Sequence, residues 1–271
     1  MKYTPDKFEK FLIKSNEKEI ALFLMELNIT KREYWCTVCA NITKLRTYKR
    51  SIDALAWCCT EKLCKNYKKY KSIRIGSFFC NFNVSIRDIM RIIIKYSCGQ
   101  QLFSIKKSLD VSARTIQRVY EKIIALMTFP NFENKKLGGP GFIVQIDETM
   151  LNFKCKSHRG RASSNKSDAL CIVEVKDKIT RCFATILPII CSQVIPGSVI
   201  WTDEHKSYSS LLKMGFLHNT VCHKYEFVNK INGVNTQAVE AFNNELKLMI
   251  KRRKGVKTTK RIDFLKEFCF F

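Results

Sequence analysis

Between Phe142 and Lys247 the apolar residues fall in short runs of strand length, and one long helical pattern follows them. The expected strands are 142–146, 169–175, 181–187, 199–202 and 220–223. The expected helices are 189–194, 207–214 and 237–253. Strands that give way to helices in this alternation predict an α/β fold with a mixed sheet flanked by helices.

Three acidic residues stand at notable places in this pattern. Asp147 ends the first strand, Asp203 ends the strand 199–202, and Glu240 lies near the start of the long helix. The order of three strands, a helix, a strand and further helices is that of an RNase H-like fold. Neighbouring strands of such a sheet present Asp147 and Asp203 together, and the helix brings Glu240 from the side.

Three carboxylates in one place repel one another unless a cation lies between them. Oxygen ligands of this kind suit Mg²⁺ or Mn²⁺. Two such ions activate the attacking oxygen and stabilise the leaving oxygen when a phosphodiester bond is cut or joined. We therefore expect Asp147, Asp203 and Glu240 to hold divalent metal for work on DNA. Taken alone, Asp147 and Asp203 are more simply interpreted as turn residues. Glu240 alone is more simply interpreted as a solvated helical glutamate.

The long helix has two distinct faces. Its apolar stripe, which we assign to the core, consists of Val239, Phe242, Leu246, Met249 and Ile250. Glu240, Asn243, Asn244 and Lys247 fall on an adjacent face, so Lys247 is expected to touch a DNA phosphate beside the metals. Glu148 and Glu204 each neighbour a predicted metal ligand. Adjacent side chains of a strand point to opposite faces, so neither glutamate is expected to bind the metal.

Cysteine spacing predicts a second metal site near the start of the chain. Cys36 and Cys39 form a CxxC pair, and Cys58, Cys59 and Cys64 follow about twenty residues later. This spacing is typical of a zinc ribbon, in which four thiolates hold Zn²⁺ and supply folding energy to a short segment. We favour Cys36, Cys39, Cys59 and Cys64, with Cys58 as the competitor of Cys59 and ordinary reduced cysteines as the alternative.

The charge of the chain indicates a polyanionic partner. Lys and Arg number 48 against 24 Asp and Glu, which gives a formal net charge of +24. Folding gains nothing from such self-repulsion, so nucleic acid is the simplest explanation. The 13 cysteines, an odd number and mostly single, and a start without a signal-peptide pattern favour a reducing compartment. The apolar segment 183–201 is interrupted by Pro188, Pro196 and Gly197, so no membrane span is expected.

The first half of the chain reads as helices around the cysteine segment. Residues 1–27 have the pattern of one amphipathic helix. Residues 102–110 and 111–126 form two helical patterns with Ser112 as a candidate N-cap, which is the layout of a helix-turn-helix with Arg114 and Arg118 on its outer face. A structural helix pair is the alternative.

We divide the chain accordingly. An N-terminal helix occupies 1–30, a zinc-ribbon-like segment 31–80, a helical DNA-binding region 81–129, a glycine-rich linker 130–141 and the catalytic domain 142–271. Two further groups of basic residues are expected to contact phosphates. They are Lys154, Lys156, Arg159 and Arg161 in a loop, and Lys251 and Arg252 at the end of the long helix.

Four stretches together resemble the DDE transposases of the ISXO-like insertion-sequence group. They are 144–148 (VQIDE), 196–208 (PGSVIWTDEHKSY), 220–228 (TVCHKYEFV) and 235–247 (NTQAVEAFNNELK). The similarity runs from about Cys36 to the C-terminus, since that group also carries an N-terminal zinc ribbon and helical DNA-binding segment. Asn243 stands where the group usually has a large aromatic residue.

The resemblance implies a DNA transposase with Asp147, Asp203 and Glu240 as its triad and Lys247 as the accompanying lysine. It also implies that His223 and Lys224 match a histidine-bearing strand motif near the site. DNA at the element ends and at the target would be the partner, and a homo-oligomer is expected. The protein would act in the nucleus of a eukaryotic host, for which the run 251–254 is a candidate signal, and otherwise in the cytoplasm with the DNA.

Two other functions fit parts of the pattern. A domesticated, catalytically silent transposase descendant would bind DNA as a regulator, but it would have no chemical reason to keep the triad. An RNase H-type nuclease would cut RNA–DNA hybrids without joining ends.

Overall fold

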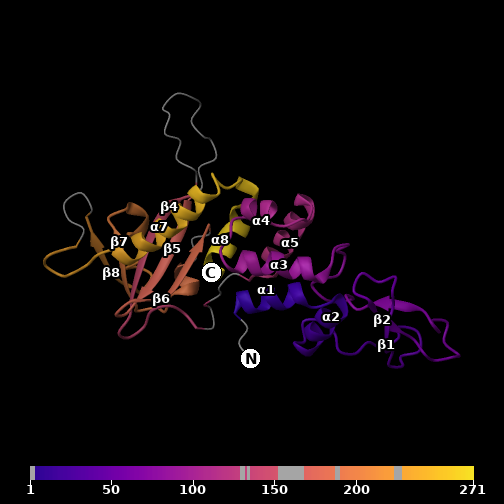
Figure 1. Cartoon of the computed structure of the whole chain (residues 1–271). Coiled ribbons are helices and arrows are strands. Elements are labelled where there is room, and N and C mark those ends of the chain that lie inside the picture. The colour runs from indigo at the N-terminus through magenta and orange to yellow at the C-terminus, as the bar shows by residue number, and fades with distance from the viewer. Residues whose placement is uncertain (1–3, 129–131, 133–134, 152–167, 187–189, 223–227) are drawn as a thin grey trace. The chain divides into compact units, whose positions relative to one another are not determined.

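The computed structural model describes residues 4–128, 132, 135–151, 168–186, 190–222 and 228–271 (Figure 1). The chain divides into two compact units, Met1–Ile123 and Ile124–Phe271. The predicted basic loop with Lys154, Lys156, Arg159 and Arg161 lies outside the described residues, as do His223 and Lys224.

The first unit begins with two helices where the sequence pattern predicted one. Helix α1 spans Pro5–Lys14 and α2 spans Glu17–Glu26. The break comes from Asn16, whose Oδ1 accepts a hydrogen bond from the Glu19 amide at 2.9 Å, while Glu19 Oε2 accepts one from the Asn16 amide at 2.8 Å. This reciprocal capping box starts a new helix at that point, so the prediction of one continuous helix was wrong.

A small antiparallel sheet and three helices complete the first unit. Strands β1 (Lys44–Thr47), β2 (Leu55–Cys58) and β3 (Tyr70–Ser72) pair in that order. Helices α3 (Ile86–Ser97), α4 (Leu102–Ser108) and α5 (Ala113–Leu126) follow. Ser112 Oγ accepts a hydrogen bond from the Thr115 amide at 3.2 Å, which confirms Ser112 as the predicted cap of α5.

The second unit is built on a mixed five-stranded sheet in the order β6-β5-β4-β7-β8. Its strands are β4 (Ile143–Met150), β5 (Asp168–Val175), β6 (Ile179–Thr185), β7 (Val199–Asp203) and β8 (Leu217–Val221). The first three pair antiparallel, and β7 and β8 join in parallel. The strand order and flanking helices confirm the predicted RNase H-like α/β fold.

Each face of the sheet carries its own apolar core. Val144, Ile146 and Ile172 belong to one cluster, together with residues of the short segments that contain α6 (Ile190–Gln193) and the 3₁₀ helix η1 (Lys206–Tyr208). Cys171 and Val173 belong to the other cluster, with apolar side chains of α7 (Gln237–Arg252) and α8 (Arg261–Phe270). A turn of 3₁₀ helix, η2 (Thr258–Lys260), precedes α8. Figure 1 shows α7 lying over β4 and β5, which it contacts.

Several element bounds differ from the sequence prediction. Strand β4 runs on through Asp147 to Met150, because β5 pairs with it over that whole length, so Asp147 does not end the strand. Helix α8 was missed, and of the predicted helix 207–214 only η1 and a series of turns form. The predicted stripe of α7 is confirmed, since Val239, Leu246 and Ile250 are buried.

We expect Leu246→Ala to destabilise the second unit by about 2–5 kcal/mol. The Leu246 side chain is fully buried, so its removal leaves a cavity in the core. Hydrogen exchange of the β4 and β5 amides measures the free energy of opening. Leu248→Ala, on the same helix with 37% of its surface exposed, is the matched control and should change that energy by no more than about 0.5 kcal/mol. Equal effects of the two substitutions would contradict the assignment of the buried face.

Candidate functional site

Four cysteines of the first unit bring their sulfur atoms together. Cys36, Cys39, Cys59 and Cys64 offer sulfurs that all lie within 4.8 Å of one another. The Cys36 and Cys64 sulfurs are 3.7 Å apart, and those of Cys39 and Cys59 are 3.8 Å apart. Four ligands about 2.3 Å from a tetrahedral Zn²⁺ would be separated by about 3.8 Å, so the thiols fit zinc.

Cys58, the competitor left open by the sequence, lies outside this cluster. It is buried on β2, and its sulfur contacts the Cys59 carbonyl at 3.6 Å instead. Successive residues of an extended segment point to opposite sides, which separates the two neighbouring thiols.

Local hydrogen bonds prepare one thiol of the cluster to lose its proton. The backbone amides of Cys39 and Val38 lower the pKa of Cys36 to about 6. The Glu61 amide also favours the Cys59 thiolate, but burial and the three neighbouring sulfurs outweigh it and raise the pKa of Cys59 to about 12. A second thiolate is therefore unfavourable until a cation balances the charge.

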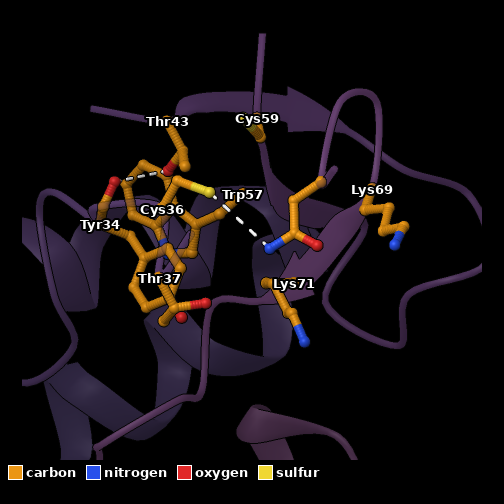
Figure 2. A pocket seen from close by; sticks show the side chains of 9 residues that line it. Tyr34, Cys36, Thr37, Thr43, Trp57, Cys59, Lys69 and Lys71 are labelled. Atoms are coloured by element: carbon orange, nitrogen blue, oxygen red, sulfur yellow. Dashed lines mark hydrogen bonds between the residues drawn. The ribbon is translucent and has the colours of Figure 1, made fainter. Parts of the chain in front are cut away.

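A small hollow adjoins the cysteine cluster (Figure 2). Tyr34 and Trp57 line it with Cys36 and Cys59, and Lys69 and Lys71 stand at its side. The side-chain nitrogen Nδ2 of Asn66 lies 3.7 Å from the Cys36 sulfur. The hollow is thus bounded by sulfur, aromatic rings and two positive charges.

In the second unit, the sheet brings Asp147 and Asp203 to the same level. Strands β4 and β7 are parallel neighbours in which Gln145 pairs with Trp201. Continuing that register by two residues puts Asp147 level with Asp203. Residues at one level of adjacent strands share a face of the sheet, so both side chains lie on the same face.

Helix α7 adds polar groups to that site. Asn243 Nδ2 donates a hydrogen bond of 2.7 Å to Asp147 Oδ2, and Glu240 lies one turn earlier on the helix. The hydroxyl of Thr236 donates to Glu240 Oε1 at 3.0 Å. Sequence reasoning placed Asn243 on the same face as Glu240 but missed its bond to Asp147, because the two residues are 96 positions apart.

The other predicted site residues shift the pKa of the half-buried Asp147 carboxyl. Burial raises its pKa, the Glu148 amide lowers it, Asp203 raises it, Lys247 lowers it and Glu240 raises it. Among the described residues only the four cysteines form a group of three or more His, Cys, Asp or Glu side chains arranged to hold a metal ion, and the three acids do not form such a group. Their oxygen donors nevertheless match the preference of Mg²⁺ and Mn²⁺.

The segment after β7 folds back toward the acids. Asp203 Oδ1 accepts a hydrogen bond from the His205 amide at 3.1 Å. Tyr208 is buried, and burial together with the charges of Glu148, Asp147 and Asp203 raises the pKa of its hydroxyl. Glu148 is exposed, and its Oε1 lies 3.4 Å from the Ser207 hydroxyl. This is consistent with a Glu148 side chain on the face of β4 opposite to that of Asp147.

The basic residues predicted to bind DNA differ in their surroundings. Arg114 is exposed, as are Lys247, Lys251 and Arg252 on α7. Arg118 is also exposed, but its guanidinium donates to the Asn81 carbonyl at 3.0 Å and lies over the Phe82 ring at 5.4 Å. Arg118 therefore serves the packing of its own unit as well as any external contact.

Comparison with known families covers the second unit. Residues 136–270 match the model of the ISXO2-like transposase domain. A search of curated proteins gives no match. No helix in the described ranges is long and apolar enough to cross a bilayer.

We expect Cys59→Ser to abolish zinc retention, because it removes one of four thiolates from the cluster. Zinc per chain after exhaustive dialysis, measured by mass spectrometry, should fall at least about tenfold, while Cys58→Ser should stay within about twofold of the parent. Loss of zinc in the Cys58 variant with retention in the Cys59 variant would reverse the assignment.

The raised pKa of Asp147 predicts a stability that depends on pH in the metal-free protein. An acid whose pKa is raised by folding destabilises the native state once the pH rises through that pKa, and it has no such effect below its ordinary value of 3.8. Asp147→Asn should therefore unfold at a higher temperature than the parent near pH 7, and the difference should vanish below about pH 4. Thermal melts across that range, with EDTA present, measure it. A difference between variant and parent that does not change with pH would contradict the account.

Proposed function

Since residues 136–270 are an ISXO2-like transposase domain of the DDE type, we propose that this chain cuts and joins DNA strands at the ends of a mobile element. Phosphoryl transfer, DNA binding and divalent metals are what that domain implies. The finer proposal is that Asp147, Asp203 and Glu240 are its metal ligands and that Lys247 contacts DNA beside them.

The observation that supports this proposal is the convergence of β4, β7 and α7 on Asp147. The β4–β7 register puts Asp203 level with Asp147, and Asn243 of α7, one turn after Glu240, donates a hydrogen bond of 2.7 Å to Asp147 Oδ2. Asp203 and Glu240 accordingly raise the pKa of this carboxyl, and Lys247 lowers it. A purely structural aspartate gains nothing from two further acids beside it, since like charges raise the cost of ionisation. The alternative in which each acid is an isolated surface residue is therefore disfavoured.

Each residue has a distinct role in the proposal. Two divalent cations, when bound, supply Lewis acidity to the attacking and leaving oxygens. Asp147 and Asp203 offer carboxylate oxygens from adjacent strands, and Glu240 offers them from the helix. The Lys247 ammonium, two turns from Glu240, holds a backbone phosphate of the DNA.

The first unit would recognise the DNA. We assign the cysteine cluster to structural zinc, which stabilises the segment that carries Lys62, Lys65, Lys68, Lys69 and Lys71. Arg114 on α5 and Lys251 with Arg252 on α7 would add phosphate contacts. A net charge of +24 supports a partner that is itself a polyanion.

A strand-transfer assay tests the proposal. With labelled DNA cloned from the sequences on either side of the coding region and with Mg²⁺ or Mn²⁺, Asp147→Ala and Asp203→Ala should lower the rate about a thousandfold. Glu204→Ala is the matched control, because it removes an exposed acid next to Asp203, and it should leave the rate within about threefold.

The same assay separates the competing functions. A parent protein that binds the DNA but is as inactive as Asp147→Ala would favour the catalytically silent descendant. Cleavage of RNA–DNA hybrids without end joining would favour the nuclease. Either result would contradict the proposed reaction.

A further inference from the structure

The start of α7 is capped from the sheet and not by its own N-cap residue. The first amides of a helix have no partner within it. Thr236 occupies the N-cap position but makes no side-chain capping bond there, and its hydroxyl donates to Glu240 instead. The Oε1 atom of Gln145 on β4 accepts hydrogen bonds from the amides of Ala238 at 2.9 Å and Val239 at 3.1 Å.

The same glutamine also holds the segment before the helix. Gln145 is only 2% exposed, and its Nε2 lies 3.3 Å from Asn235 Oδ1. Asn235 Oδ1 in turn accepts a hydrogen bond from the Gln237 amide at 3.3 Å. Both ends of one buried amide group thus bind the chain at the point where α7 begins.

A second contact joins α7 to β4 farther along. Asn243, 2% exposed, donates to Asp147 Oδ2, while its own Oδ1 is buried without a hydrogen-bond partner among the described residues. Such an unpaired oxygen costs about 1–3 kcal/mol, which an apolar side chain of similar shape would avoid. Stability therefore does not explain an asparagine here, whereas control of the Asp147 carboxylate does.

The two contacts keep strand and helix in step. Gln145 and Asp147 are two residues apart on one face of β4, a distance of about 6.6 Å. The residues that they bind on α7, Ala238 and Val239 at one end and Asn243 at the other, are separated by about 6–7.5 Å of helix. Because the spacings match, α7 runs beside β4 in a fixed register, and Glu240 lies between the two points of attachment.

We propose that Gln145 and Asn243 are positioning residues, which lock α7 onto β4 so that the carboxylates of Asp147 and Glu240 are in place before a cation binds. The proposal rests on the proposed function, because it assigns these two side chains to the acidic metal site. Neither residue needs to touch the cation or the DNA. The Asn243 amide orients one carboxylate, and the Gln145 amide fixes the helix that carries the other.

Affinity for Mn²⁺ is the appropriate readout, since it does not depend on turnover. The full chain is first loaded with zinc to fill the cysteine cluster, and free Mn²⁺ is then titrated and followed by electron paramagnetic resonance. Loss of a residue that orients a metal ligand weakens metal binding by about 10–100-fold. We expect at least about tenfold weaker binding for Gln145→Met and for Asn243→Leu.

Conservative rescue and matched controls separate positioning from a general loss of structure. Gln145→Glu keeps an oxygen that accepts from both α7 amides but loses the Nε2 donor to Asn235, so it should bind Mn²⁺ more tightly than Gln145→Met does. Gln237→Met and Asn244→Leu alter exposed neighbours on the same helix and should stay within about twofold. Asn243→Leu loses the hydrogen bond to Asp147 together with an unpaired buried oxygen, two effects of similar size, so it should melt within about 5 °C of the parent.

The outcomes distinguish this proposal from the proposed function. If Asp147→Ala weakens Mn²⁺ binding while Gln145→Met and Asn243→Leu bind like the parent, the metal site stands and the positioning role is wrong. If Asp147→Ala itself binds like the parent, the acidic site is wrong and both proposals fall. Should Gln145→Met fail to fold, Asn243→Leu decides the matter by the same comparison.

Discussion

Electrostatic repulsion between Asp147 and the neighbouring acids is the constraint on which the proposed metal site of the second unit depends. Asp147 is half-buried, and both Asp203 and Glu240 oppose its ionisation. Among the described residues, the Glu148 amide, the Asn243 amide and the Lys247 charge act in the opposite direction. Repulsion of this kind favours the binding of a cation, because a divalent ion is the simplest group that offsets several negative charges at once.

The sheet and helix α7 position the acidic residues in different ways. Parallel pairing of β4 with β7 sets the level of two acids, and the cores on both faces keep that sheet rigid. Helix α7 supplies its apolar stripe to one of those cores and its polar face to the acids. The cation sites proposed for the two units favour different metals, since soft thiolates suit zinc and hard carboxylates suit magnesium or manganese.

Much of this architecture could be predicted from local sequence patterns. Period-two and helical patterns gave the strands, the long helix and its buried stripe, and cysteine spacing gave the cluster. The break at Asn16 could also have been predicted, although one helix was expected there. Asn16 and Glu19 have the spacing of a capping box, which competes with the amphipathic pattern. The full length of β4 was not, since it depends on pairing with β5 after an intervening loop. The bonds from Gln145 and Asp147 to α7 are likewise invisible locally, because they join residues more than 90 positions apart.

Anomalous diffraction from crystals soaked in Mn²⁺ would locate the cations of the second unit. We expect an anomalous peak on the α7 side of the sheet, with oxygens of Asp147 and Asp203 about 2.0–2.3 Å away and Glu240 in the same coordination sphere or that of an adjacent ion. Peaks confined to other acids, or a Glu240 carboxylate that stays beyond reach of any ion near Asp147, would contradict it.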